Sequence, residues 1–286
     1  MIQQETGPYR PAALKHTRSQ LPARFHPGSL SHKRTQLALL LLATFGLFIV
    51  GCGSDNSPST QTITLPVKTL TVSGEPELTI TNHVGIIHVH SGNADNVIVR
   101  AELHADTDGG SLDDMQVNTA QHGNAITITT SNQKPDDWLA THREEIDLDI
   151  TMPVSGNLNI TSLQGFITID GISGQMNIQT TTSLIAITHA TLKGQSSFKS
   201  NAGPLSYNGM LDPQSTTLFQ TNLGPITVTL PATTSFSLVA STGKLATPTG
   251  KEDVTNDFGS TTIGSAPHAQ LELHSSMGKI ALHKTP

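Results

Sequence analysis

Apolar and polar residues alternate on both sides of a series of small turn residues between positions 158 and 247. The turns fall at Gly165, Ser183, Gly203, Gly224 and Gly243, so successive turns are about 20 residues apart. Apolar side chains stand five positions before the turns and two and four positions after them: Ile160, Ile178, Phe198, Phe219 and Leu238; Ile167, Ile185, Leu205, Ile226 and Leu245; Ile169, Ile187, Tyr207 and Val228. Alternation with a period of two predicts strands with one buried face.

Each unit of this repeat is predicted to be two short strands joined by a tight turn. A unit of about 20 residues cannot bury its apolar face alone, so neighbouring units are expected to stack and share a continuous core. The sequence therefore predicts an all-β, single-domain parallel β-solenoid with coils of about 18–21 residues.

The same pattern also fits around Gly85 and Gly278, which extends the predicted stack to seven coils in one register. Gly243 and Gly278 are separated by about two coil lengths. We therefore expect a degenerate coil at residues 258–263. Three alternating runs, at residues 97–105, 125–130 and 145–152, are expected to be strands that continue or cap one end of the stack. The loop 135–145 contains Trp138 and is expected to be polar and partly helical.

The N-terminal part has the pattern of an export signal. Residues 1–36 are basic, and an apolar run at 37–50 follows Lys33 and Arg34 and ends at Gly51. That run is shorter than the ~20 residues that span a membrane. The sequence Ile49-Val50-Gly51-Cys52 resembles the bacterial lipobox, in which the signal is cut before a cysteine that then carries fatty-acyl chains such as palmitate.

Cys52 is consequently the expected lipid attachment site, and it is the single cysteine of the chain. The expected organisation is a leader at 1–51, a lipidated Cys52 with a flexible linker at 52–66, and a folded domain at 67–286. The alternative is an ordinary thiol behind a plain signal peptide or membrane anchor.

The net charge of the folded domain limits its possible partners. Residues 1–51 contain six Lys and Arg and one acidic residue, so the remainder has 16 − 6 = 10 basic and 22 − 1 = 21 acidic side chains and a formal charge of −11. Such a domain repels phosphate backbones, and no basic face for nucleic acid is present. The expected partners are a membrane, through the lipid, and an unknown protein or polysaccharide at the cell surface.

Several short motifs recur along the chain: Leu78-Thr-Ile-Thr81 with Gly85-Ile-Ile-His-Val89, Ile146-Asp-Leu-Asp-Ile-Thr-Met-Pro153, Gly165-Phe-Ile-Thr-Ile169 and Gly224-Pro-Ile-Thr-Val228. Together these motifs resemble the bacterial putative-adhesin family of cell-envelope β-solenoids. The resemblance implies a lipoprotein form of an envelope β-solenoid, and it supplies no catalytic residues.

Candidate chemistry is sparse. Solenoid enzymes that cleave acidic polysaccharides place charged groups on one face of adjacent coils, whereas the outward positions after the turns at Gly165, Ser183, Gly203 and Gly224 contain one carboxylate, Asp170. The acidic pairs are expected in solvated loops: Asp113/Asp114, Asp136/Asp137 and Glu144/Glu145. No catalytic residue, cofactor or metal is predicted.

A histidine pair is the one candidate metal motif. His88 and His90 should project together from one strand, with His83 before the turn. They could bind zinc if a neighbouring coil supplied a third ligand. The equivalent positions of the other coils offer none, which favours a surface histidine pair.

These observations favour a bacterial, exported and lipid-anchored protein at the cell membrane or outer surface that is not an enzyme and acts in adhesion or envelope interaction. Two alternatives of other classes remain. One is a sensory or regulatory lipoprotein that docks on a membrane partner. The other is a polysaccharide-acting β-helix enzyme with a pocket under the Trp138 loop.

Overall fold

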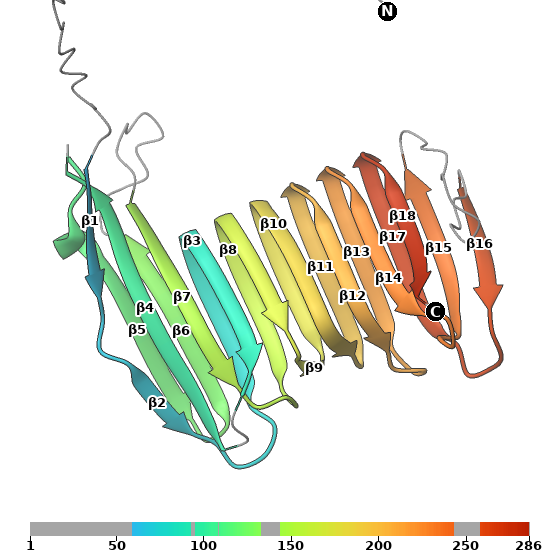
Figure 1. Ribbon diagram of the computed structural model, residues 1–286, viewed down its shortest axis with the longest axis horizontal. Coiled ribbons are helices and arrows are strands. Elements are labelled where there is room, and N and C mark those ends of the chain that lie inside the picture. Colours follow the sequence, from blue (N-terminus) through green and yellow to red (C-terminus); the bar gives the residue numbers. More distant parts are fainter. Residues whose placement is uncertain (1–58, 93–94, 108, 133–143, 243–257, 286) are drawn as a thin grey trace, which may run out of the picture. The chain divides into compact units, whose positions relative to one another are not determined.

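The computed structural model describes residues 59–92, 95–107, 109–132, 144–242 and 258–285. These residues form an all-β structure with parallel and antiparallel pairings in one hydrogen-bonded sheet of 18 strands, and their only helical element is the 3-10 turn η1 (Leu112–Asp114) (Figure 1). Within the described residues, no helix is long and apolar enough to cross a membrane.

Parallel pairing organises most of the sheet. Each unit consists of two strand segments that flank a corner, which is the turn at Gly85, Gly165, Ser183, Gly203, Gly224 or Gly278. Three strands run unbroken through their corners: β3 (Glu77–Ser91), β8 (Asn157–Asp170) and β10 (Met176–Leu192). In three further units the corner separates two strands: β11 (Gln195–Ala202) and β12 (Leu205–Leu211), β13 (Thr216–Leu223) and β14 (Ile226–Pro231), β17 (Ala269–Met277) and β18 (Ile280–Thr285). The two-residue strand β9 (Ser173–Gly174) extends the pairing of β10.

The predicted register is confirmed for four consecutive turns. Gly165 pairs with Ser183, which is the next turn residue in the chain. Ile185, Leu205 and Ile226 stand two positions after three successive turns, and each pairs with the next. The first coil also lies where the pattern placed it, because Gly85 pairs with Gly165 although a long segment of chain separates them.

The C-terminal order differs from the prediction. β17 and β18 pair directly with β13 and β14, so the corner at Gly278 follows the corner at Gly224. β15 (Phe236–Thr242), which precedes Gly243 in the chain, pairs with the far side of β17. The expected coil at residues 258–263 is wrong: β16 (Phe258–Ile263) is an antiparallel partner of β15. Gly243 and Leu245 lie outside the described residues. Two turn residues that lie one period apart in the sequence mark two similar units, but these units need not be neighbours in the sheet.

Antiparallel strands occupy the end of the sheet that lies opposite the C-terminal strands. β4 (Asn96–Asp106) pairs antiparallel with β7 (Glu144–Met152), β1 (Thr60–Thr64) and β2 (Lys68–Thr71), while β5 (Met115–His122) pairs antiparallel with β6 (Ala125–Asn132). β6 and β7 then pair parallel with the two halves of β3. The three predicted strands are confirmed in β4, β6 and β7. Folded structure begins earlier than the expected boundary at Val67, because β1 lies within the expected linker and pairs with β4.

The inward side chains form one buried cluster shared by the strands before and after the corners. At the middle of the stack this cluster is aromatic. Phe198 and Phe219 stack with ring centroids 4.7 Å apart, and Tyr207 packs against Phe219 at 5.7 Å. The Tyr207 hydroxyl lies 2.5 Å from the carbonyl oxygen of Met210, and burial raises the pKa of this phenol. Aromatic pairs of this kind stabilise a core beyond the area that they bury.

A buried polar row accompanies the corners, and the apolar pattern did not predict it. Three positions before the corner each unit places a small polar side chain inward: Asn82, Ser162, Thr180, Ser200, Thr221 and Ser275. Thr221 and Ser275 donate to the carbonyl oxygens of Gly203 and Gly224, at 3.3 and 2.9 Å. These hydroxyls satisfy corner carbonyls that would otherwise be buried without a partner.

Removal of a stacked core ring should destabilise the fold strongly. Phe219→Ala is expected to lower the free energy of unfolding by about 3–5 kcal/mol, because it deletes a fully buried ring and leaves a cavity between its neighbours. The neighbouring outward substitution Leu218→Ala should cost about 1 kcal/mol or less, since Leu218 is half exposed. Urea unfolding measures both, and equal losses would contradict the inward assignment of Phe219.

The corners that are occupied by glycine leave no room for a side chain. At Gly165 φ is +137°, and an added Cβ would overlap the carbonyl oxygen of Gly85. Gly123 also has positive φ, +62°, but it has open space around it. We expect Gly165→Ala to cost about 1–3 kcal/mol more than Gly123→Ala, because only the first must push a neighbouring backbone away. Thermal unfolding of the two variants tests this difference.

Candidate functional site

The strands before the corners present one continuous outward surface, which we call the pre-turn face. Three outward side chains on each of seven paired strands form three rows, and fifteen of these 21 side chains are Asn, Gln, Ser or Thr. In strand order β3, β8, β10, β11, β13, β17, β15 the rows are Glu77, Asn157, Gln175, Gln195, Thr216, Gln270, Ser237; Thr79, Asn159, Asn177, Ser197, Leu218, Glu272, Val239; and Thr81, Thr161, Gln179, Lys199, Gln220, His274, Ser241.

Hydrogen bonds link these side chains from one strand to the next. Asn177 Nδ2 donates to Asn159 Oδ1 at 3.3 Å, and Asn159 Nδ2 donates to Glu77 at 3.4 Å. Each amide keeps further donor and acceptor capacity, and adjacent strands repeat about every 4.7–4.9 Å. The face therefore offers a regular, mostly uncharged array of hydrogen-bonding groups.

A depression of about 220 Å³ interrupts this face where β13, β17 and β15 lie side by side, and Gln220, Ser241, His274 and Ser276 contribute to its lining. Ser241 Oγ lies 2.5 Å from His274 Nδ1. His274 Nε2 lies 3.6 Å from Glu272, which is too long for a hydrogen bond. The depression joins a hydroxyl and an imidazole, and sequence reasoning missed it because β15 and β17 do not neighbour each other in the chain.

The histidine pair lies on the post-turn face, the outward surface of the strands after the corners. His88 Nδ1 and His90 Nε2 lie 3.7 and 3.3 Å from the carboxylate of Asp149 on β7, and Arg100 of β4 contacts the same carboxylate at 3.5 Å. His83 lies before the corner, apart from the pair. The pair is at the surface, as expected. The sequence analysis did not identify Asp149 as a partner of the histidine pair, because it searched the equivalent positions of the other coils and Asp149 lies outside the repeat.

Metal binding finds little support in this arrangement. Within the described ranges, no group of three or more His, Cys, Asp and Glu side chains is positioned to hold a metal ion. Arg100 also places a positive charge beside Asp149, where a cation would have to bind.

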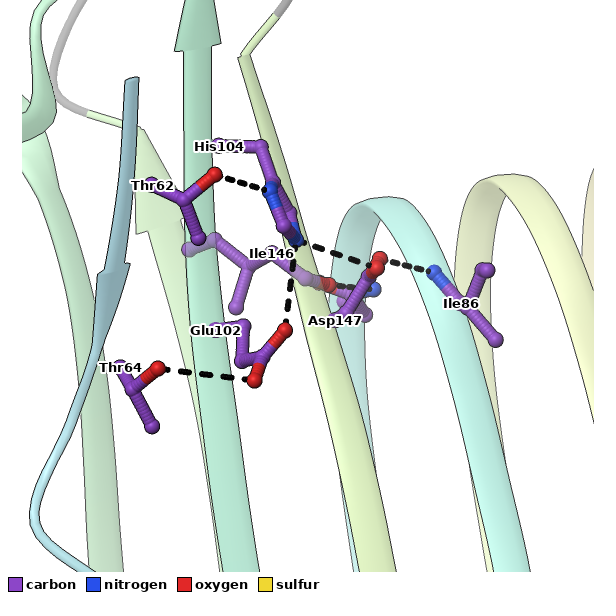
Figure 2. Close-up of polar contacts among 8 residues, drawn as sticks. Thr62, Thr64, Ile86, Glu102, His104, Ile146 and Asp147 are labelled. Carbon is purple, nitrogen blue, oxygen red and sulfur yellow. Dashed lines mark hydrogen bonds and ion pairs between the residues drawn. The ribbon is translucent and has the colours of Figure 1, made fainter. Parts of the chain in front are cut away.

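A second histidine connects the N-terminal strands. Figure 2 shows His104 of β4 between Thr62 of β1 and Asp147 of β7, with distances of 3.0 Å from Thr62 Oγ1 to Nδ1 and 3.3 Å from Nε2 to Asp147. Glu102 approaches Nε2 at 3.9 Å. Asp147 also accepts a 2.7 Å hydrogen bond from the backbone amide of Ile86 at the first corner. This cluster fastens β1, the first described strand, to the parallel stack.

Asp170, the single carboxylate among the predicted outward positions, has a clear electrostatic environment. Thr188 donates a 2.6 Å hydrogen bond to Asp170 Oδ1, and His189 Nδ1 lies 2.7 Å from the same oxygen. These contacts, with Thr188 first, hold the pKa of Asp170 below its ordinary value of 3.8. A general acid in glycoside hydrolysis needs the opposite shift, so Asp170 is equipped as an ionised surface group.

The remaining predicted residues fall into two groups. Asp113 and Asp114 lie in η1, and Glu144 and Glu145 lie in β7 rather than in the expected loop, because β4 pairs with them. Cys52, Asp136, Asp137 and Trp138 lie outside the described residues.

No protein-family model and no curated protein matches this sequence. The fold is similar to a putative cell adhesion protein from Clostridium sporogenes, with 8% sequence identity, a TM-score of 0.48 and coverage of 80% of this chain and 100% of that chain. It is also similar to a putative adhesin from Parabacteroides distasonis, with 9% identity, a TM-score of 0.25 and coverage of 78% and 97% of the two chains. A putative lipid binding protein from the same species has 10% identity, a TM-score of 0.22 and coverage of 81% and 98%.

Protonation of Asp170 should matter only at acid pH. Its lowered pKa means that the ionised carboxylate stabilises the fold above about pH 4, and that this contribution is lost as the pH falls through the lowered pKa. Asp170→Asn should therefore be slightly less stable than wild type at pH 6, by less than about 1 kcal/mol because the side chain is half exposed. The difference should vanish near pH 2.

Unfolding curves at both pH values measure this difference. Thr188→Val, which removes the strongest contact of the carboxylate, should behave in the same way. A difference that persists at pH 2 would contradict the assigned cause.

Proposed function

We propose that this chain is an exported, lipid-anchored and surface-exposed binding protein, a non-catalytic parallel β-solenoid that holds a neutral, hydroxyl-rich polymer of the cell envelope against its pre-turn face. The single observation that carries this proposal is the array of Asn, Gln, Ser and Thr, which supply fifteen of the 21 outward side chains across seven paired strands. The successive parallel pairings at steps of about 20 residues support the solenoid part of the proposal.

A polysaccharide fits the chemistry of this face better than a charged polymer. Sugar hydroxyls both donate and accept hydrogen bonds, and so do the side-chain amides and hydroxyls in the rows. The formal charge of −11 beyond residue 51 opposes the binding of a polyanion. Each contact is exposed to water and weak, so affinity must come from many repeats bound at once along the rows.

The lipid anchor belongs to the same proposal. The apolar run at 37–50 and Cys52 favour export and acylation, and two acyl chains suffice for stable membrane attachment. A binding face carried on such an anchor would serve adhesion or envelope attachment.

An enzymatic alternative centres on Ser241 and His274, a hydroxyl–imidazole contact that lines a depression and has a carboxylate, Glu272, nearby. Acyl transfer needs backbone amides that are free to stabilise an oxyanion. Ser241 lies within β15, which is hydrogen-bonded to β16 on one side and to β17 on the other. The non-catalytic function is therefore the better-supported one.

Substitutions on the pre-turn face should abolish polymer binding. We expect the full chain to be retarded in native gels that contain a neutral polysaccharide and unaffected by an acidic one. The triple variant Asn177→Ala, Gln179→Ala, Gln195→Ala should bind at least tenfold more weakly, because it empties the centre of the array.

The matched control carries Ser206→Ala, Asn208→Ala and Thr227→Ala on the post-turn face and should bind as wild type does. Equal loss in both variants, or stronger retardation by the acidic polymer, would rule out the proposed site. Release of acyl groups from an acylated polysaccharide that disappears in Ser241→Ala would favour the enzyme instead.

A further inference from the structure

Exposed apolar side chains gather at the corners of the stack. Of the ten large hydrophobic residues that are exposed in the described part of the chain, five lie within two positions of a corner residue, with exposed fractions of 41–58%. We call this set the corner ridge: Ile86, Leu163, Phe166, Leu223 and Met277. A contiguous exposed apolar surface of this kind marks an interaction site more often than scattered hydrophobic residues do.

The pairing register brings the members of the ridge together in two groups. Ile86 pairs with Phe166, and Phe166 pairs with the half-buried Leu184 of the next strand. At the other end Leu223 pairs with Met277. Pro204 and Pro225 occupy the same position after their corners as Leu184 does, so apolar residues follow one another at this position along five successive corners. At the sixth corner, Gly278, this position is Lys279, and the apolar residue is Met277 directly before the corner.

The chain segments that form the corners contain no acidic residues, although the chain is acidic overall; Asp147 of β7 lies against the first corner from outside these segments. Each segment comprises the two residues before the corner, the corner residue itself and the residue after it, at Gly85, Gly165, Ser183, Gly203, Gly224 and Gly278. No aspartate or glutamate occurs among these 6 × 4 = 24 positions, and the charged or titratable members are Lys279 and His83. Beyond the first corner, where Asp147 lies, a surface of this composition can approach phospholipid headgroups without repulsion, unlike the rest of a domain with a charge of −11.

The first described strand, β1, starts on the side of the structure where the corners lie. Thr60 of β1 pairs with Asp106, and the neighbouring Ala105 pairs with Glu144 at the start of β7. The carbonyl oxygen of Ile146, two positions further along β7, lies against Gly85 at the first corner. Ser59 follows Cys52 by only seven positions in the chain, and a segment of that length spans at most about 25 Å. An acylated Cys52 would therefore hold this edge, and not the opposite ends of the strands, close to the bilayer.

We propose that the corner ridge is a membrane-docking edge, which rests on the lipid bilayer that anchors Cys52 and inserts its apolar side chains at the headgroup boundary. This inference rests on the lipid attachment in the proposed function. Docking by the corners would leave the pre-turn and post-turn faces standing away from the bilayer and open to their own ligands. The ridge adds apolar contact to the two acyl chains and fixes the orientation of the domain.

Single-cysteine labelling of the full lipidated chain tests the proposal. Acylation blocks Cys52, the only native cysteine, so an introduced cysteine is the only free thiol. Phe166→Cys and Leu223→Cys place an environment-sensitive fluorophore on the ridge. Met210→Cys and Val154→Cys are matched controls, with exposed fractions of 56% and 52% at positions remote from the corners.

The labelled proteins are reconstituted in vesicles of phosphatidylethanolamine and phosphatidylglycerol that contain acyl-chain quenchers. We expect quenching at least threefold stronger for the two ridge labels than for the two controls. Equal quenching at all four positions overturns the proposal, and so does stronger quenching of the controls.

A second comparison excludes an effect of the label itself. A label at Thr181→Cys, an exposed polar position of a central corner, should also be quenched. Quenching should fall at least threefold when Phe166→Ser, Leu223→Ser and Met277→Ser are added. If the label stays equally quenched, the apolar side chains do not dock the domain, and the proposal is wrong.

The failure of this inference can be told apart from the failure of the proposed function. Mass spectrometry of the purified protein shows whether Cys52 carries acyl chains; an unmodified Cys52 contradicts both the anchor and the docking edge. Acylated protein with unquenched ridge labels contradicts the docking edge alone. Binding to neutral polysaccharide should be the same for the ridge triple variant and wild type, because the ridge lies outside the pre-turn face.

Discussion

The structure depends on the close approach of backbones at the corners. At Gly165, Gly203, Gly224 and Gly278 the backbone lies against the carbonyl oxygen of the preceding corner, so closely that an added Cβ would overlap that oxygen. The inward side chains stay inward only in this register, because a slip of one residue would turn each of them outward. The core and the outward rows both follow from this register.

Register also explains why the surface is divided into regions of different chemistry. Identical positions of successive units lie next to one another, so a preference for Asn, Gln, Ser and Thr at outward positions becomes the pre-turn face, and large apolar residues beside the corners become the corner ridge. The two proposed activities use different regions and do not compete. A polymer bound to the pre-turn face and a bilayer under the ridge could be engaged by the same molecule.

The N-terminal strands connect this repetitive part to the segment that leads to Cys52. β1 and β2 pair only with β4 among the described strands, and His104 joins β1 to Asp147, which in turn holds the amide of Ile86 at the first corner. Force applied through a lipid anchor would reach β1 first and pass through these contacts into the stack. The antiparallel pairs also cover one terminal edge of the parallel ladder, which a stack of strands requires in order to avoid pairing with other chains.

The sequence by itself determined the all-β class, the unit length and which side chains point inward, because these depend on local alternation with a period of two. Ile160, Phe198 and Val228 are buried where the pattern placed them. The tertiary structure alone decided which units are neighbours: Gly278 follows Gly224 in the stack, and β16 turns back along β15. Units with the same pattern have interchangeable contact surfaces, so the pattern cannot specify their order. The contacts of Asp149 with the histidine pair, and of Ser241 with His274, likewise depended on long-range pairing, since each joins residues that only the assembled sheet brings together.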